Sequence, residues 1–191
     1  MNIKKLLSLF LILCMLLATI NVSADTAEDF EYTVTSGKIT ITGCNITDEH
    51  VEIPAEIDSK PVERIGENAF RGTSYITSVS IPDSVKAIMS GAFSNCWQLT
   101  EVSFSNQLQL ISSGAFSGCS QLKKITIPDS VRQVGASAFS ACTSLESVII
   151  GGGVNAIAAS TFANCHSLSK CLYSKKCQTD YARCFLSVQF A

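Results

Sequence analysis

The sequence predicts a solenoid, a linear stack of similar coils, built from about five copies of a 23-residue unit. An Ala-Phe pair recurs at 69–70, 92–93, 115–116 and 138–139, and Thr-Phe follows at 161–162. Leucine keeps the same step at Leu99, Leu122, Leu145 and Leu168. Because a lone coil of this size cannot bury its apolar side, the copies must stack on one another.

The N-terminal segment 1–24 reads as a secretory signal peptide. Lys4 and Lys5 form a basic start, Leu6 to Ile20 is a mostly apolar run, and Val22-Ser23-Ala24 resembles a cleavage site. The run is shorter than the roughly 20 residues of a membrane-spanning helix, so export is favoured over a permanent N-terminal anchor. No second long apolar run follows. We therefore expect a secreted or cell-surface protein with no integral membrane span after signal removal.

Residues 25–47 are predicted to form an N-terminal cap. Phe30 to Val34 and Lys38 to Ile41 alternate in polarity around Thr35-Ser-Gly37, which is typical of a β-hairpin. Terminal repeats need a polar outer face, and this segment is acidic. The first repeat contains five extra residues around Asp58-Ser-Lys-Pro61, which we interpret as a surface turn.

Each unit between residues 48 and 170 is predicted to contain one strand and one opposing turn. Leu122 to Ile127 reads leucine-x-x-aliphatic-x-aliphatic, and its last residues alternate with the two-residue period of a strand. The strands of successive coils should pair as one parallel sheet. The Ala-Phe-Ser-x-Cys stretch has small residues, so a short helical or 3₁₀ segment is expected on the opposite wall.

The repeat also predicts a ladder of identical buried side chains along the stack. Its members are Phe70, Phe93, Phe116, Phe139 and Phe162, together with Cys96, Cys119, Cys142 and Cys165. Stacked cysteines lie within the range of Cα separations that disulfides allow. Because ladder neighbours point the same way and cysteine packs well as a small hydrophobe, buried free thiols are the favoured interpretation.

The unit resembles the BspA-type leucine-rich repeats of secreted and cell-surface proteins. Two stretches carry the resemblance: Ile81-Pro-Asp-Ser-Val85 with Gly91-Ala-Phe-Ser-Asn-Cys96, and Ile127-Pro-Asp-Ser-Val131 with Ser137-Ala-Phe-Ser-Ala-Cys142. The match covers roughly residues 48–170. It implies a leucine-rich-repeat solenoid that is right-handed and curved, with short parallel strands on its concave side. For some family members it implies adhesion to host matrix proteins.

Residues 171–191 match the repeat poorly and form either a Cys-containing C-terminal cap or the truncated edge of a longer protein. Phe185 lies one repeat period after Phe162, so a degenerate sixth coil is a third interpretation. Cys171, Cys177 and Cys184 could staple such a cap as disulfides. Their spacing lacks the close Cys-x2-4-Cys pair that is typical of zinc sites, so no metal is expected.

The composition argues against catalysis and against nucleic-acid binding. The two histidines, His50 and His166, lie in no recognisable nucleophile or metal motif, so we expect no enzyme activity and no cofactor. Gly151-Gly-Gly153 lacks the lysine of a phosphate loop and reads as a loosened turn. Removing Lys4 and Lys5 leaves 12 basic and 16 acidic residues, a net charge of −4, whereas a surface that binds phosphates needs the opposite sign.

Binding therefore remains as the expected function, and the outward strand positions are the candidate concave binding face. These are Ser78, Ser80, Glu101, Ser103, Lys124, Thr126, Ser147 and Ile149. They lack the aromatic and arginine anchors of tight interfaces, so we expect a weak or multivalent contact with a protein or glycan on a host or cell surface, as in an adhesin. One alternative is a structural spacer or a truncated fragment of a larger surface protein, with no ligand of its own, and another is a secreted effector or inhibitor.

Overall fold

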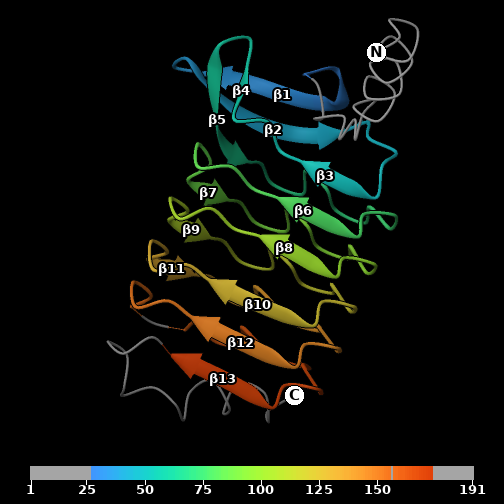
Figure 1. Ribbon diagram of the computed structural model, residues 1–191, viewed down its shortest axis with the longest axis vertical. Helices are drawn as coiled ribbons and strands as arrows, with labels where there is room; N and C mark the ends of the chain where they lie inside the picture. The colour runs from blue at the N-terminus through green and yellow to red at the C-terminus, as the bar shows by residue number, and fades with distance from the viewer. Residues whose placement is uncertain (1–26, 156, 174–191) are drawn as a thin grey trace, which may run out of the picture.

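The computed structural model describes residues 27–155 and 157–173, which wind into a stack of coils (Figure 1). A 3₁₀ turn, η1 (Ala27–Asp29), precedes a hairpin at one end of the stack, and the strand β13 (Lys170–Tyr173) lies at the other end. No helix long and apolar enough to cross a bilayer occurs in these two ranges. The predicted signal peptide (1–24) and residues 174–191 of the predicted tail lie outside them.

One wall of the stack consists of short parallel strands, one per coil (Figure 1). They are β3 (His50–Glu52), β6 (Ser78–Ser80), β8 (Glu101–Ser103), β10 (Lys124–Ile127), β12 (Ser147–Ile150) and β13. Equivalent residues are in register from β6 to β8 and from β10 through β12 to β13. Residues such as Val79, Ile125 and Val148 point into the core while their neighbours face outward. The predicted strand of each coil and its parallel stacking are confirmed.

The sequence predicts one continuous parallel sheet, but this wall is divided into two sheets. β3, β6 and β8 form one three-stranded sheet and β10, β12 and β13 another. The interruption coincides with Phe104, which occupies the position of Ile81 and Ile127. Both isoleucines are buried, whereas the larger phenyl ring is only partly buried. An aromatic residue at this position does not by itself prevent pairing, because Tyr173 pairs with Ile150 in the β12–β13 ladder.

A second wall of shorter strands was not predicted. β5 (Lys60–Ile65), β7 (Ala87–Ile88), β9 (Leu110–Ile111) and β11 (Gln133–Val134) pair in parallel, one coil to the next. The N-terminal hairpin of β1 (Phe30–Thr35) and β2 (Lys38–Cys44) continues this sheet, because β2 pairs in parallel with β5. The hairpin therefore covers one end of this sheet.

The five-residue insertion in the first repeat is more ordered than a surface turn. β4 (Glu56–Ile57) pairs antiparallel with the start of β5. Asp58 and Ser59 form the turn with positive φ angles of 50° and 57°. Ile57 is buried, and the Tyr32 hydroxyl donates a hydrogen bond of 2.9 Å to Asp58. The insertion thus forms a small β-hairpin that is joined to β1.

The Ala-Phe segment contains hydrogen-bonded turns rather than the expected helix or 3₁₀ segment. The amides of Ala92 and Ser94 bond back within their own coil, to Met89 and Gly91, whereas those of Phe93 and Asn95 bond to the next coil. A helix would direct every amide into its own coil. Residues with positive φ, such as Gly91 and Asn95 at 66° and 60°, produce the alternation and join the coils along this wall as well.

Candidate interaction surface

The buried phenylalanine ladder determines how the outward-facing side chains of successive coils are aligned. Phe70, Phe93, Phe116, Phe139 and Phe162 are all at most 1% exposed. Successive rings stack with centroids 4.8, 5.2, 5.3 and 5.7 Å apart and planes within 11° of parallel. Such offset stacks add stability beyond the area that they bury. The ladder keeps the coils in register and therefore aligns the residues that point outward.

The four repeat cysteines form a second buried ladder of free thiols. Each Sγ donates to the carbonyl oxygen of the phenylalanine 26 residues earlier, at 3.0 Å for Cys96 and 3.1–3.3 Å for Cys119, Cys142 and Cys165. Burial raises the pKa of the Cys96 thiol to about 12 and that of Cys119 further still. The Cys96 and Cys119 thiols therefore act as protonated donors to buried carbonyls. Cys171, in contrast, is disulfide-bonded.

The Gly151-Gly-Gly153 segment is tightly packed, so the prediction of a loosened turn is wrong. A Cβ on Gly151 would collide with the carbonyl carbon of Pro128, and one on Gly153 with the carbonyl oxygen of Asp129. The Gly152 amide donates to the Asp129 carboxylate at 2.6 Å. Glycine is needed here because two consecutive turns of the stack approach each other closely.

We call the outward residues of β3, β6, β8, β10, β12 and β13 the strand face. All eight residues of the candidate binding face lie on it, with Ser78 and Ser147 half-buried and the other six exposed. The structure adds His50 and Glu52 on β3 and Lys170 and Leu172 on β13. The period could have found the last two, since they lie one repeat after Ser147 and Ile149. The insertion obscured the first two.

The half of the strand face on β3, β6 and β8 is acidic and rich in hydroxyl groups. His50, Ser78 and Glu101 form one row across the strands, and Glu52, Ser80 and Ser103 the next. His50 Nδ1 lies 2.7 Å from the Ser78 hydroxyl. These residues line a hollow of about 210 Å³. The pair is exposed to water on a flat sheet, which is not the enclosed arrangement of a nucleophile, base and oxyanion site.

The half on β10, β12 and β13 is basic and partly apolar. Lys124, Ser147 and Lys170 form one row, and Thr126, Ile149 and Leu172 the next. Ile149 and Leu172 are 44% and 49% exposed. The equivalent exposed positions on β6 and β8 carry serines, Ser80 and Ser103. This half therefore offers positive charge and exposed apolar area side by side.

A groove of about 390 Å³ separates the two halves at the interruption of the sheet. It is lined by Thr100, Glu101, Val102, Lys123, Lys124 and Thr126. Val102 is only partly buried, whereas its equivalents Val79 and Val148 are fully buried. The groove places an acidic side chain on one rim and two basic side chains on the other.

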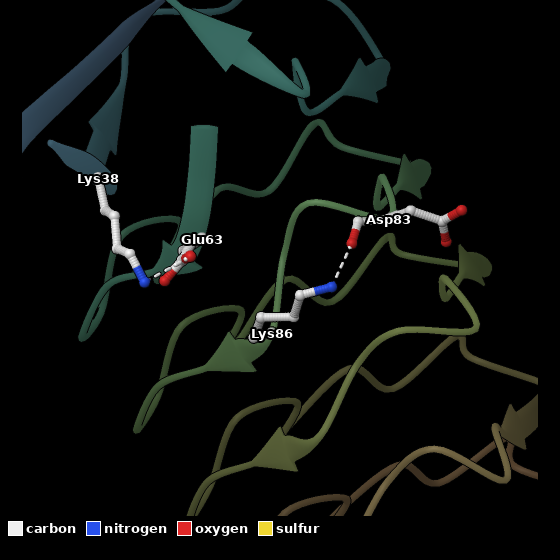
Figure 2. A network of polar contacts seen from close by, with 4 residues as sticks. All are labelled: Lys38, Glu63, Asp83 and Lys86. Carbon is white, nitrogen blue, oxygen red and sulfur yellow. Dashed lines mark hydrogen bonds and ion pairs between the residues drawn. The ribbon is translucent and has the colours of Figure 1, made fainter. Parts of the chain in front are cut away.

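The second wall is polar but internally paired near the N-terminal end. Lys38 Nζ lies 2.8 Å from the Glu63 carboxylate, and Lys86 Nζ donates to the Asp83 carbonyl at 2.8 Å. Both contacts are drawn as dashed lines in Figure 2. The Lys86 amide also donates to the Glu63 carbonyl. Here the side chains of Lys38, Glu63 and Lys86 form contacts within the fold.

The chain matches the family model described as "BspA type Leucine rich repeat region", in six copies over residues 63–189. It belongs to the BspA-type leucine-rich repeat family. The match extends beyond residue 170, so the family model counts as repeat much of the segment that the sequence analysis treated as a tail. No curated protein matches the sequence.

Three solved structures of leucine-rich repeat proteins show a similar fold. A leucine-rich repeat protein from Bacteroides ovatus is 29% identical, with a TM-score of 0.70 over 78% of this chain and 40% of that one. A leucine rich cell surface protein from Faecalibacterium prausnitzii is 32% identical, with a TM-score of 0.67 over 80% and 40%. A leucine-rich repeat protein from Bacteroides capillosus is 33% identical, with a TM-score of 0.60 over 67% and 98%. The chain thus spans about 40% of the length of the first two.

The described part of this BspA-type chain presents open surfaces with regularly repeated side chains. Within residues 27–155 and 157–173, no group of three His, Cys, Asp or Glu side chains is arranged to hold a metal ion. The hollows described above are open and shallow. What the arrangement provides is a row-by-row pattern of charge, hydroxyl groups and apolar area, fixed in register by the ladders beneath it.

Proposed function

We propose that this BspA-type chain is an extracellular or cell-surface protein-interaction module whose contact surface is the strand face. The observation that carries the proposal is the register of outward side chains across β6–β8 and β10–β12–β13. A rigid, extended array of this kind is the surface that solenoids use for partners. The relative from Faecalibacterium prausnitzii that bears the words "cell surface" supports the location.

The chemistry of the strand face favours a weak or multivalent contact. Its residues are mostly polar or charged, with Ile149 and Leu172 as apolar exceptions, and the strand face carries no tryptophan or arginine among its outward positions on the described strands. Those two residues, with tyrosine, dominate tight interfaces. A partner presented in many copies, such as a matrix protein or a glycan on a host or cell surface, compensates for weak single contacts. The proposed role is therefore adhesion, after export by the segment 1–24.

The test is retention of extracellular matrix proteins on a surface coated with the full chain. The face variant Ser103→Arg with Thr126→Arg places two bulky cations on exposed positions of β8 and β10, one in each half of the strand face. The control Gln133→Arg makes the same kind of change at an exposed position of β11 on the other wall. We expect the face variant to lose retention and the control to keep it, with both melting at the wild-type temperature.

The competing function is a structural spacer with no ligand of its own. The small side chains at Ser78, Ser80 and Ser103 favour it, because they would equally suit a surface that contacts only water. The same experiment separates the two functions. A spacer would retain no matrix protein or matrix glycan above a blank surface, and equal retention by the wild type and the face variant would exclude the strand face as the contact.

A further inference from the structure

The two halves of the strand face differ in charge, and no acidic side chain lies among the outward positions of β10, β12 and the described β13. Among the residues that the structure describes, the one ion pair joins Lys38 and Glu63 on the other wall. Lys123 and Glu146 occupy equivalent positions before β10 and β12 and offset each other's charge. The net positive charge of this half therefore comes from Lys124 and Lys170, both exposed.

We define the basic–apolar patch as Lys124, Lys170, Ile149 and Leu172. Strands in a sheet lie about 4.8 Å apart, so the two lysine Cα atoms are about 10 Å apart with Ser147 midway between them. Ile149 and Leu172 sit two residues further along their strands, about 7 Å away. Both flexible lysine side chains can therefore reach a carboxylate that lies above Ser147. An apolar group further along the strands can at the same time cover the side chains of Ile149 and Leu172.

The patch is too small for a globular partner or a second copy of the chain. Three strands of four residues span roughly 14 by 13 Å, or about 180 Å², whereas a stable protein interface buries about 800 Å² on each partner. A single extended segment has the right dimensions. Its alternate side chains point the same way at intervals of about 7 Å, which equals the separation of the lysine row from the Ile149–Leu172 row.

We propose that the basic–apolar patch binds an extended peptide segment that carries an acidic side chain and, two residues away, an apolar one. The carboxylate lies between Lys124 and Lys170, and the apolar side chain lies on Ile149 and Leu172. The residue between them points away from the sheet, so its identity is not read. This inference rests on the proposed function, because it names the kind of partner that the strand face selects.

The N-terminal half of the strand face disfavours the same segment. In place of Lys124 and Lys170 it has Glu101 and His50 in the corresponding row, and Glu52 follows two residues after His50. An acidic segment is repelled there and attracted to the C-terminal half. The charge pattern therefore fixes where along the stack the segment binds.

The test is a titration of the ¹⁵N-labelled full chain with short acetylated peptides, followed by amide chemical shifts. The probe is Thr-Glu-Thr-Leu-Thr, and the spacing control Thr-Glu-Leu-Thr-Thr has the same composition but directs the two side chains to opposite sides of a strand. Two further controls, Thr-Lys-Thr-Leu-Thr and Thr-Glu-Thr-Ser-Thr, reverse the charge and remove the apolar group. We expect the probe alone to shift the amides of β10, β12 and β13, less so as ionic strength rises.

Variants of exposed residues then identify the contacts without disturbing the core. Lys124→Glu and Lys170→Glu should each weaken binding of the probe about fivefold. Ile149→Ser, which introduces the residue found at the equivalent positions on β6 and β8, should weaken it by a similar factor. Arg132→Glu makes the same charge change next to β11 on the other wall and should leave the affinity unchanged.

Three results would overturn the inference. The first is equal binding of the probe and the spacing control, and the second is an affinity that does not respond to Lys124→Glu. The third is saturable, Lys124-dependent binding of polygalacturonate with none of the peptide, which would assign the patch to an anionic glycan. If matrix proteins are retained through the strand face but Lys124→Glu leaves that retention unchanged, the inference fails while the proposed function stands.

Discussion

Replacing Phe116 by alanine removes the central ring of the phenylalanine ladder. The ring is fully buried and stacks between Phe93 at 5.2 Å and Phe139 at 5.3 Å. Phe104 also meets it edge-on, at 5.6 Å and 72°. No other ring of the ladder has three aromatic neighbours among the described residues. Its loss therefore affects three coils at once.

The expected cost follows from burial and from these ring contacts. A buried Phe→Ala change costs about 3–5 kcal/mol, and each aromatic pair contributes about 0.5–1.5 kcal/mol beyond its area. Three such pairs place Phe116→Ala at the upper end, about 5 kcal/mol. Among the described residues, Phe162 stacks only on Phe139, at 5.7 Å, so Phe162→Ala belongs at the lower end, about 3 kcal/mol. The total free energy of unfolding of a domain is about 5–15 kcal/mol, so either loss is a large part of it.

Urea unfolding followed by circular dichroism measures both free energies of unfolding. Val34→Ala is the control, because Val34 is 48% exposed on β1 and should change stability by less than about 0.5 kcal/mol. An unchanged melting temperature for Phe116→Ala would contradict the stacked-coil interior. Equal losses at Phe116 and Phe162 would contradict the assignment of the extra cost to neighbouring rings.

Three further predictions concern the cysteine ladder and the turns. At pH 8 the Cys96 thiol, with a pKa of about 12, is ionised in roughly one molecule in ten thousand, so it should resist alkylation in the folded chain and react in urea, as mass spectrometry would show. Ala141 has a φ of 57°, where an L side chain is strained, so Ala141→Gly should raise the free energy of unfolding by about 0.5–1 kcal/mol. Gly118 occupies the equivalent position one coil earlier, so Gly118→Ala should lower the free energy of unfolding. Gly151→Ala should cost about 1–3 kcal/mol and lower the melting temperature, because its methyl group would collide with Pro128.

The period of the sequence was sufficient to predict the repeating strand and the buried side chains. A strand with a fixed place in every unit, such as Lys124–Ile127, repeats the same alternation, and stacking then determines which residues face inward. The second wall could not be found in this way, because a two-residue strand such as Ala87–Ile88 shows no alternation. The turns were also mistaken for helix, since small residues suit both.

The outward chemistry was only partly predictable. The candidate binding face was extended by the structure to β13, where Lys170 and Leu172 continue the rows of Lys124 and Ile149. The interruption between β8 and β10 coincides with Phe104, and a pattern of hydrophobic classes treats that ring as equivalent to isoleucine. Local packing of this kind is visible only when the coils are placed against one another.

The repetition of the same few buried side chains from coil to coil has an evolutionary consequence. The interior restricts only a minority of the positions in each coil, for example Ala115, Phe116, Cys119, Leu122, Ile125, Ile127, Val131 and Val134. Homologues can therefore diverge to about 30% identity and still keep the architecture, as the Bacteroides ovatus and Faecalibacterium prausnitzii proteins do. Overall similarity between such proteins reports mainly on how they pack, and a shared ligand should be sought by comparing their solvent-facing rows.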